Sequence, residues 1–79
     1  MEERIIAIIA EVLNIDGSII TPENNFREDL GADSLDVLDI LLNIENEFNI
    51  MLPTDDVNSV ITVKDLLECA KVAPHRIYG

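Results

Sequence analysis

The chain has 79 residues, which predicts a single domain over residues 1–79 with a thin core and little room for a deeply enclosed active site. Five Lys and Arg residues against 16 Asp and Glu give a net charge of −11, which argues against binding to nucleic acid or to an anionic membrane surface. A hydrophobic fraction of 48% is too high for a disordered acidic tail, and one cysteine, Cys69, cannot form an internal disulfide. We therefore expect an acidic, globular, monomeric protein of the cytoplasm.

The first predicted helix covers residues 2–14, where apolar side chains recur one turn apart at Ile5, Ile9 and Leu13. Turn-forming residues at 16–18 end the helix region, and residues 17–32 are expected to form a long loop. Apolar residues within this loop predict that it is pinned across the core instead of being solvated throughout. These residues are Ile19, Ile20, Phe26 and Leu30.

The second predicted helix begins near Asp33 or Ser34, either of which can cap it, and ends at Phe48 or Asn49. Spacing at about 100° per residue gives it a core face. This face consists of Val37, Ile40, Leu41, Ile44 and Phe48.

A second apolar seam runs along the same helix, at Leu35, Leu38 and Leu42. Asp39 flanks it on one edge and Glu45 on the other. Two interpretations remain open: neighbouring elements wrap the helix on most sides, or the seam is an exposed docking strip rimmed by acids. Residues 28–61 contain nine acids and no Lys or Arg, which favours the docking strip and a basic partner.

The rest of the chain predicts one short and one longer helix. Residues 55–61 fit one or two helical turns, and Thr62 opens the last helix with Asp65 in a capping-box position. Pro74 ends that helix, and residues 74–79 are expected to form a mobile tail. The predicted fold is all-α: a small bundle of three main helices plus one short helix, with a long loop between the first two.

No catalytic or metal-binding constellation is visible in the sequence, so we expect no enzyme activity. His75 is isolated, and Cys69 has the position of a small core residue. Ser34 is the residue that stands out, since it follows Asp33 and opens an acidic helix. A helix N-terminus favours an attached anion such as a phosphodiester, although a serine there is also an ordinary cap.

Residues 28–36, EDLGADSLD, together with the preceding Phe26, resemble the signature of the acyl carrier protein family. The resemblance extends over about residues 3–72 in length, order and spacing. It implies that a phosphopantetheinyl transferase moves 4′-phosphopantetheine from coenzyme A onto Ser34, between Asp33 and Leu35. The thiol of this arm would then carry acyl groups as thioesters, and the protein itself would catalyse nothing.

The resemblance also implies partners, namely acyl-transfer, condensing and related enzymes of fatty-acid or polyketide type with basic docking surfaces. The residues expected to meet them are Asp33, Leu35, Asp36, Leu38, Asp39, Leu42 and Glu45. Members of the family shelter the acyl chain between helices. The residues expected to line that cavity are Ile40, Ile44, Phe48, Val60 and Leu67.

Some positions depart from the family pattern, because uncharged residues stand where acids are common. They are Asn46, Asn49, Met51, Thr54 and Asn58. These departures suggest a specialised carrier instead of the housekeeping one. Two alternatives remain open: a carrier of aminoacyl or peptidyl cargo, and a non-carrier adaptor that binds a basic partner through its leucine seam while Ser34 merely caps the helix.

Overall fold

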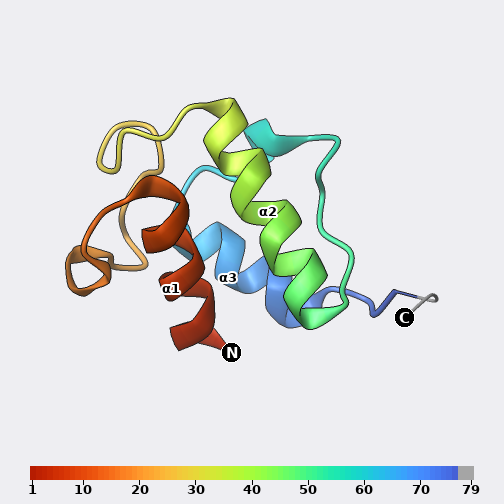
Figure 1. Cartoon of the computed structure of the whole chain (residues 1–79). Helices are drawn as coiled ribbons and strands as arrows, with labels where there is room; N and C mark the ends of the chain where they lie inside the picture. The colour runs from red at the N-terminus through yellow and green to blue at the C-terminus, as the bar shows by residue number, and fades with distance from the viewer. Residues whose placement is uncertain (77–79) are drawn as a thin grey trace.

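Helices account for the regular structure of the chain in the computed structural model, which describes residues 1–76 (Figure 1). The elements in order are α1 (Glu2–Leu13), the 3₁₀ turn η1 (Gly17–Ile19), α2 (Ser34–Phe48), the 3₁₀ turn η2 (Val57–Ser59) and α3 (Val63–Val72). The predicted all-α bundle is confirmed, and η2 is the predicted short helix. The turn η1 overlaps the turn-forming residues predicted at 16–18 and adds one 3₁₀ turn to the segment expected to be loop.

Helices α1 and α2 approach each other closely, whereas α3 meets the core mainly through its side chains. Ile5 and Ile9 of α1, Ile40 and Ile44 of α2 and Leu66 of α3 are all buried in one cluster. Both α1 and α2 end at an asparagine in the left-handed conformation, Asn14 and Asn49, each with φ of 56°. Asparagine tolerates this conformation better than most residues, which is why the helices end there.

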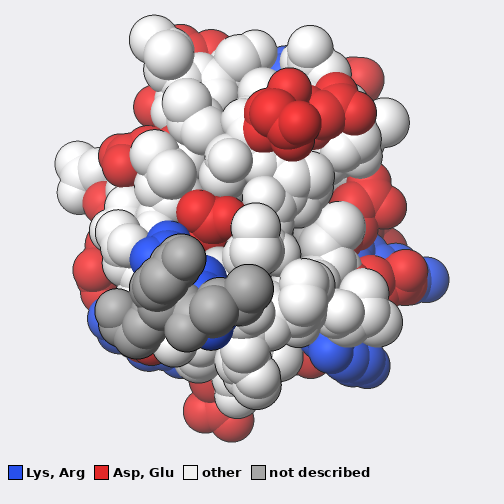
Figure 2. All heavy atoms as spheres, turned by 90° about the vertical axis from the view of Figure 1, so that its right-hand side faces the viewer, with Lys and Arg blue, Asp and Glu red and all other residues white. Residues whose placement is uncertain are grey.

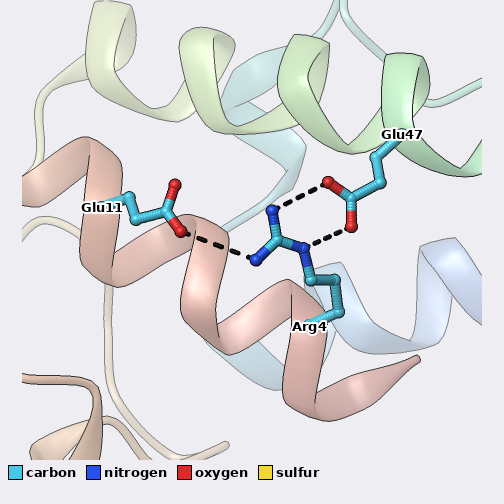
Figure 3. A network of polar contacts seen from close by, with 3 residues as sticks. All are labelled: Arg4, Glu11 and Glu47. Atoms are coloured by element: carbon cyan, nitrogen blue, oxygen red, sulfur yellow. Dashed lines mark hydrogen bonds and ion pairs between the residues drawn. The ribbon is translucent and has the colours of Figure 1, made fainter.

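An ion-pair network also joins α1 to α2 on the surface (Figure 3). The Arg4 guanidinium donates to both carboxylate oxygens of Glu47, with Nη2 3.0 Å from Oε1, and its Nη1 lies 3.6 Å from Oε1 of Glu11. The hydrogen bond from Arg4 lowers the pKa of Glu47 below its usual value. Because these side chains are exposed, the network contributes little stability and mainly sets how α1 lies against α2.

The long loop between α1 and α2 is fastened to the start of α3. The Phe26 N–H donates to the Ile61 carbonyl at 3.0 Å, and the Val63 N–H donates to the Asn24 carbonyl at 3.0 Å. Phe26 is fully buried and Ile20 is buried, as expected of a pinned loop. The expectation is wrong for Ile19, which is exposed in η1.

The segment after α3 is not a free tail in its first residues. The Met51 N–H donates to the Pro74 carbonyl at 2.9 Å, and the Arg76 N–H donates to the Asn49 carbonyl at 2.9 Å. An isolated bridge pairs Ile50 with His75. Of the segment predicted to be mobile, 74–79, residues 74–76 thus pair through their backbone with the loop after α2. Residues 77–79 lie outside the described part of the chain.

Candidate functional site

The N-terminus of α2 presents Ser34, and three local features build this end of the helix. Gly31 takes a left-handed conformation with φ of 69°, which suits a residue without Cβ. The Ala32 N–H then donates to the Phe26 carbonyl at 2.8 Å, which anchors the chain to the buried loop. Ser34 is exposed as the first residue of α2, where a helix N-terminus favours an attached anion.

The acids on either side of Ser34 form a reciprocal capping box. The Asp36 N–H donates to Oδ1 of Asp33 at 2.9 Å, and the Asp33 N–H donates to Oδ2 of Asp36 at 3.1 Å. The two carboxylates therefore cap the helix instead of hydrogen-bonding to the Ser34 hydroxyl. Asp33 caps the helix, so the alternative that Ser34 is the cap residue is wrong.

A basic side chain that the sequence interpretation did not assign to the site contacts Ser34. Arg27 reaches from the long loop and donates from Nη2 to the Ser34 hydroxyl oxygen at 3.0 Å. The same nitrogen lies 2.8 Å from Oδ1 of Asn58 in η2. Sequence reasoning missed Arg27 because no motif spacing marks it and its partner Asn58 lies far along the chain.

The leucine seam of α2 is partly in solvent, in agreement with the docking-strip interpretation. Leu35 is 75% exposed and Leu42 is 42% exposed, while Leu38 is half-buried between them. Asp39 is exposed beside the seam. Neighbouring elements thus leave both ends of the seam uncovered.

Glu45 does not belong to this exposed surface, contrary to expectation. It is only 9% exposed, and its Oε2 accepts a hydrogen bond from the buried Leu52 N–H at 2.7 Å. Its Oε1 lies 3.5 Å from Nη2 of Arg76. The helical wheel placed Glu45 at the edge of the seam, but the loop after α2 folds back over it and turns the carboxylate inward.

The end of the molecule at which α2 begins carries exposed acids, among them Glu28, Asp29 and Asp33. Figure 2 turns the view about the vertical axis of Figure 1, so its upper part is that end. Acidic side chains lie there among uncharged ones, and the basic side chains visible on this face lie mostly in the lower half. Acids predominate near Ser34, although Arg27 contacts its hydroxyl, and a mainly negative surface favours association with a basic partner.

Other reactive side chains of residues 1–76 do not form a second candidate site. The Cys69 thiol in α3 is half-buried, and burial raises its pKa, which disfavours the reactive thiolate. Among residues 1–76, no cluster of three or more His, Cys, Asp or Glu side chains is arranged to hold a metal ion. The described residues also include no helix long and apolar enough to cross a membrane.

Comparison with known proteins decides the family. The family model described as "Phosphopantetheine attachment site" matches residues 3–70. The chain belongs to the acyl carrier protein family. An acyl carrier protein of Syntrophobacter fumaroxidans is 46% identical over 68 residues, which cover 86% of this chain and 84% of the relative. One from Helicobacter pylori is 44% identical over 66 residues, covering 84% and 85% respectively.

A solved structure from Mycobacterium tuberculosis, described as an acyl carrier protein, shares the fold. Its TM-score is 0.82 at 34% identity, over 90% of this chain and 95% of that chain. The chain is thus a non-catalytic carrier of acyl groups on a phosphopantetheine arm, of the kind used in fatty-acid biosynthesis. A carrier of this family interacts with a phosphopantetheinyl transferase and with biosynthetic enzymes.

The expected cavity-lining residues of this carrier share its core. Ile40, Ile44 and Val60 are fully buried. Phe48 and Leu67 are partly buried and pack against the same cluster. An acyl chain that entered this core would have to displace side chains that are packed against one another.

Proposed function

We propose that Ser34 is the residue that carries the phosphopantetheine arm. The observation that carries this proposal is the exposed serine at the first position of α2, within the segment at residues 28–36 that resembles the family signature. The residues fit the group, because the hydroxyl is at an anion-favouring helix end and neither neighbouring carboxylate hydrogen-bonds to it. The arm supplies the thiol that forms the thioester when it is attached.

The attachment reaction requires a base that the carrier does not supply. The Ser34 oxygen would form a bond to the phosphorus of the pantetheine phosphate of coenzyme A, and the bond from that phosphorus to the adenosine bisphosphate would break. The hydroxyl proton has to leave, yet the described hydrogen bond to this oxygen comes from Arg27, which donates. We infer that a group of the transferase accepts this proton, so that access to the hydroxyl matters more here than a local base.

Substituting Ser34 by alanine should abolish modification completely. Wild type and Ser34→Ala would be incubated with coenzyme A and a phosphopantetheinyl transferase, and intact mass would be measured. Wild type should gain one phosphopantetheinyl group and Ser34→Ala none. Ser18→Ala, which removes another exposed serine, is the matched control and should react like wild type. A mass gain on Ser34→Ala would overturn the assignment, and no gain on wild type would favour the adaptor alternative.

We further propose that the exposed face of α2 docks the transferase and the acyl-transfer and condensing enzymes through their basic surfaces. The surface consists of Asp33, Leu35, Asp36, Leu38, Asp39 and Leu42. Its carboxylates would attract the partner over long range, and its exposed leucines would provide the contact area. Small contacts allow fast release, which a carrier that visits several enzymes requires.

Raising the ionic strength should slow modification by the transferase. Electrostatic steering raises association rates by roughly 10–1000-fold and is screened by salt, so we expect kcat/KM to fall about tenfold between low and high salt. Asp39→Asn should reduce this salt dependence, whereas Glu2→Gln, which removes an exposed acid from α1, should leave it unchanged. A rate that does not change with salt would contradict the steering model.

We also propose that Ile40, Ile44, Phe48, Val60 and Leu67 line the acyl-binding cavity. Their shared core position supports this. Each buried methylene gains ~0.8 kcal/mol, so a six-carbon stretch gains about 5 kcal/mol, close to the whole stability of a small domain. Opening the packed core offsets most of that gain, so the acyl chain can still be transferred to a partner enzyme.

We propose that the carrier acts in the cytoplasm, since a reducing compartment keeps the arm thiol able to form thioesters.

A further inference from the structure

Arg27 differs from the other arginines of the described chain in the charge of its partners. Arg4 pairs with Glu47 and Glu11, and Arg76 pairs with Glu45. The side-chain hydrogen bonds of Arg27 go to two neutral oxygens, Oγ of Ser34 and Oδ1 of Asn58. Within residues 1–76 its positive charge is therefore not neutralised by a described ion pair.

The guanidinium of Arg27 is also held in place. Its backbone N–H donates to Oδ1 of Asn25 at 2.9 Å, and the residue is half-buried. Asn58 fixes the far end of the side chain from η2, across a sequence separation of 31 residues. A cation that is already oriented loses less conformational entropy when it binds an anion.

We propose that Arg27 binds the phosphodiester of the arm once the arm is attached, an inference that rests on Ser34 being the attachment residue. The phosphorus would be bonded to the Ser34 oxygen, the same atom that Arg27 contacts at 3.0 Å. Guanidinium groups pair with phosphate oxygens through their fork of N–H donors, and the pair is stronger than a neutral hydrogen bond. Arg27 is thus a positioning residue for the root of the arm, and Asn58 orients Arg27.

The charges around Ser34 explain why a cation is needed beside the attached phosphodiester. Attachment adds a negative charge beside Asp33 and Asp36, on a chain whose net charge is already −11. The two carboxylates repel the phosphodiester, while the helix N-terminus attracts it. Arg27 supplies the full positive charge that offsets the repulsion, so the arm can be attached within an acidic surface that still faces outward to basic partners.

The test compares the carrier before and after attachment in wild type, Arg27→Gln and Lys71→Gln. The control removes the same charge from an exposed position on α3. Intact mass establishes attachment, ³¹P NMR reports the environment of the phosphodiester, and thermal unfolding is measured for both forms. In wild type and Lys71→Gln, the ³¹P resonance should differ from that of a phosphopantetheinyl-serine peptide. In Arg27→Gln the resonance should move toward the peptide value.

The melting temperature gives a second readout, taken as the change on attachment within each variant. Because a surface ion pair with phosphate stabilises the modified form, attachment should raise the melting temperature of wild type by about 2–5 °C relative to its effect on Arg27→Gln. Added salt should shrink the difference, and Asn58→Ala should lose part of it. The Arg27 side-chain N–H resonances of wild type should also shift on attachment, a result that needs no variant to fold.

The outcomes separate this inference from the attachment assignment. If wild type gains no mass at Ser34, the assignment fails. If wild type and Arg27→Gln both gain the arm but show the same ³¹P shift and the same change in melting temperature, the assignment holds and the role of Arg27 is overturned. Arg27 N–H resonances that do not respond to attachment would overturn it as well.

Discussion

Substituting Phe26 by alanine should lower the free energy of unfolding by about 3–5 kcal/mol, the usual cost of truncating a buried aromatic. Phe26 has 0% of its surface exposed. The total free energy of unfolding of a small domain is ~5–15 kcal/mol, so this one substitution removes a large share of the stability. Denaturant unfolding of the unmodified protein measures the effect. Ile19→Ala is the control, because Ile19 lies in the same loop with its side chain exposed, and it should change stability little.

The same substitution should also slow the attachment of the arm. The backbone of Phe26 bonds to Ile61 on one side and to Ala32 on the other, so it connects the start of α3 to the residues just before Ser34. Losing the ring loosens the segment that presents the serine to the transferase. The rate would be measured at a temperature at which both proteins are folded. If Phe26→Ala were as stable as Ile19→Ala, backbone hydrogen bonds alone would be sufficient to hold the loop in place.

Much of this site follows from local sequence. The capping sequence at Asp33 to Asp36 fixes where α2 begins, so the exposure of Ser34 depends on residues within one helical turn. The apolar residues of the long loop predicted that it is pinned to the core, which holds for Ile20 and Phe26 but not for Ile19. The helix start was predictable because the capping residues are close together along the chain, and the pinned loop because apolar side chains in a loop favour burial even when their partners are distant.

The features that were missed depend on contacts between distant segments. Arg27 meets Asn58 across 31 residues, and Glu45 meets Arg76 across 31 residues. A helical wheel gives the angular positions of side chains around one helix. It does not show which loop, distant in sequence, packs over them. The contacts of both arginines therefore form only in the folded chain. Arg27 contacts Ser34, and Arg76 pairs with the buried Glu45.

Substituting Glu45 by alanine should lower the free energy of unfolding by about 2–3 kcal/mol, since a buried donor left without a partner costs about that much. The donor is the Leu52 N–H, 2.7 Å from Oε2 of Glu45, and Leu52 is itself buried. Asp39→Asn is the matched comparison, because Asp39 is an exposed acid of the same helix. It should leave stability almost unchanged and raise the KM of the transferase. The opposite pattern, with Glu45→Ala as stable as wild type but poorly docked, would place Glu45 on the partner surface after all.

Glutamine at position 45 separates the two interactions of this carboxylate. Glu45→Gln keeps an oxygen that can accept from the Leu52 N–H, and loses only the charge that faces Arg76. That pair is partly exposed and 3.5 Å long, and pairs of this kind contribute about 0–1 kcal/mol. We therefore expect Glu45→Gln to retain most of the stability that Glu45→Ala loses. If both variants lose the same amount, the ion pair with Arg76 stabilises the loop after α2 more than the hydrogen bond does, and Arg76→Gln should then reproduce the loss.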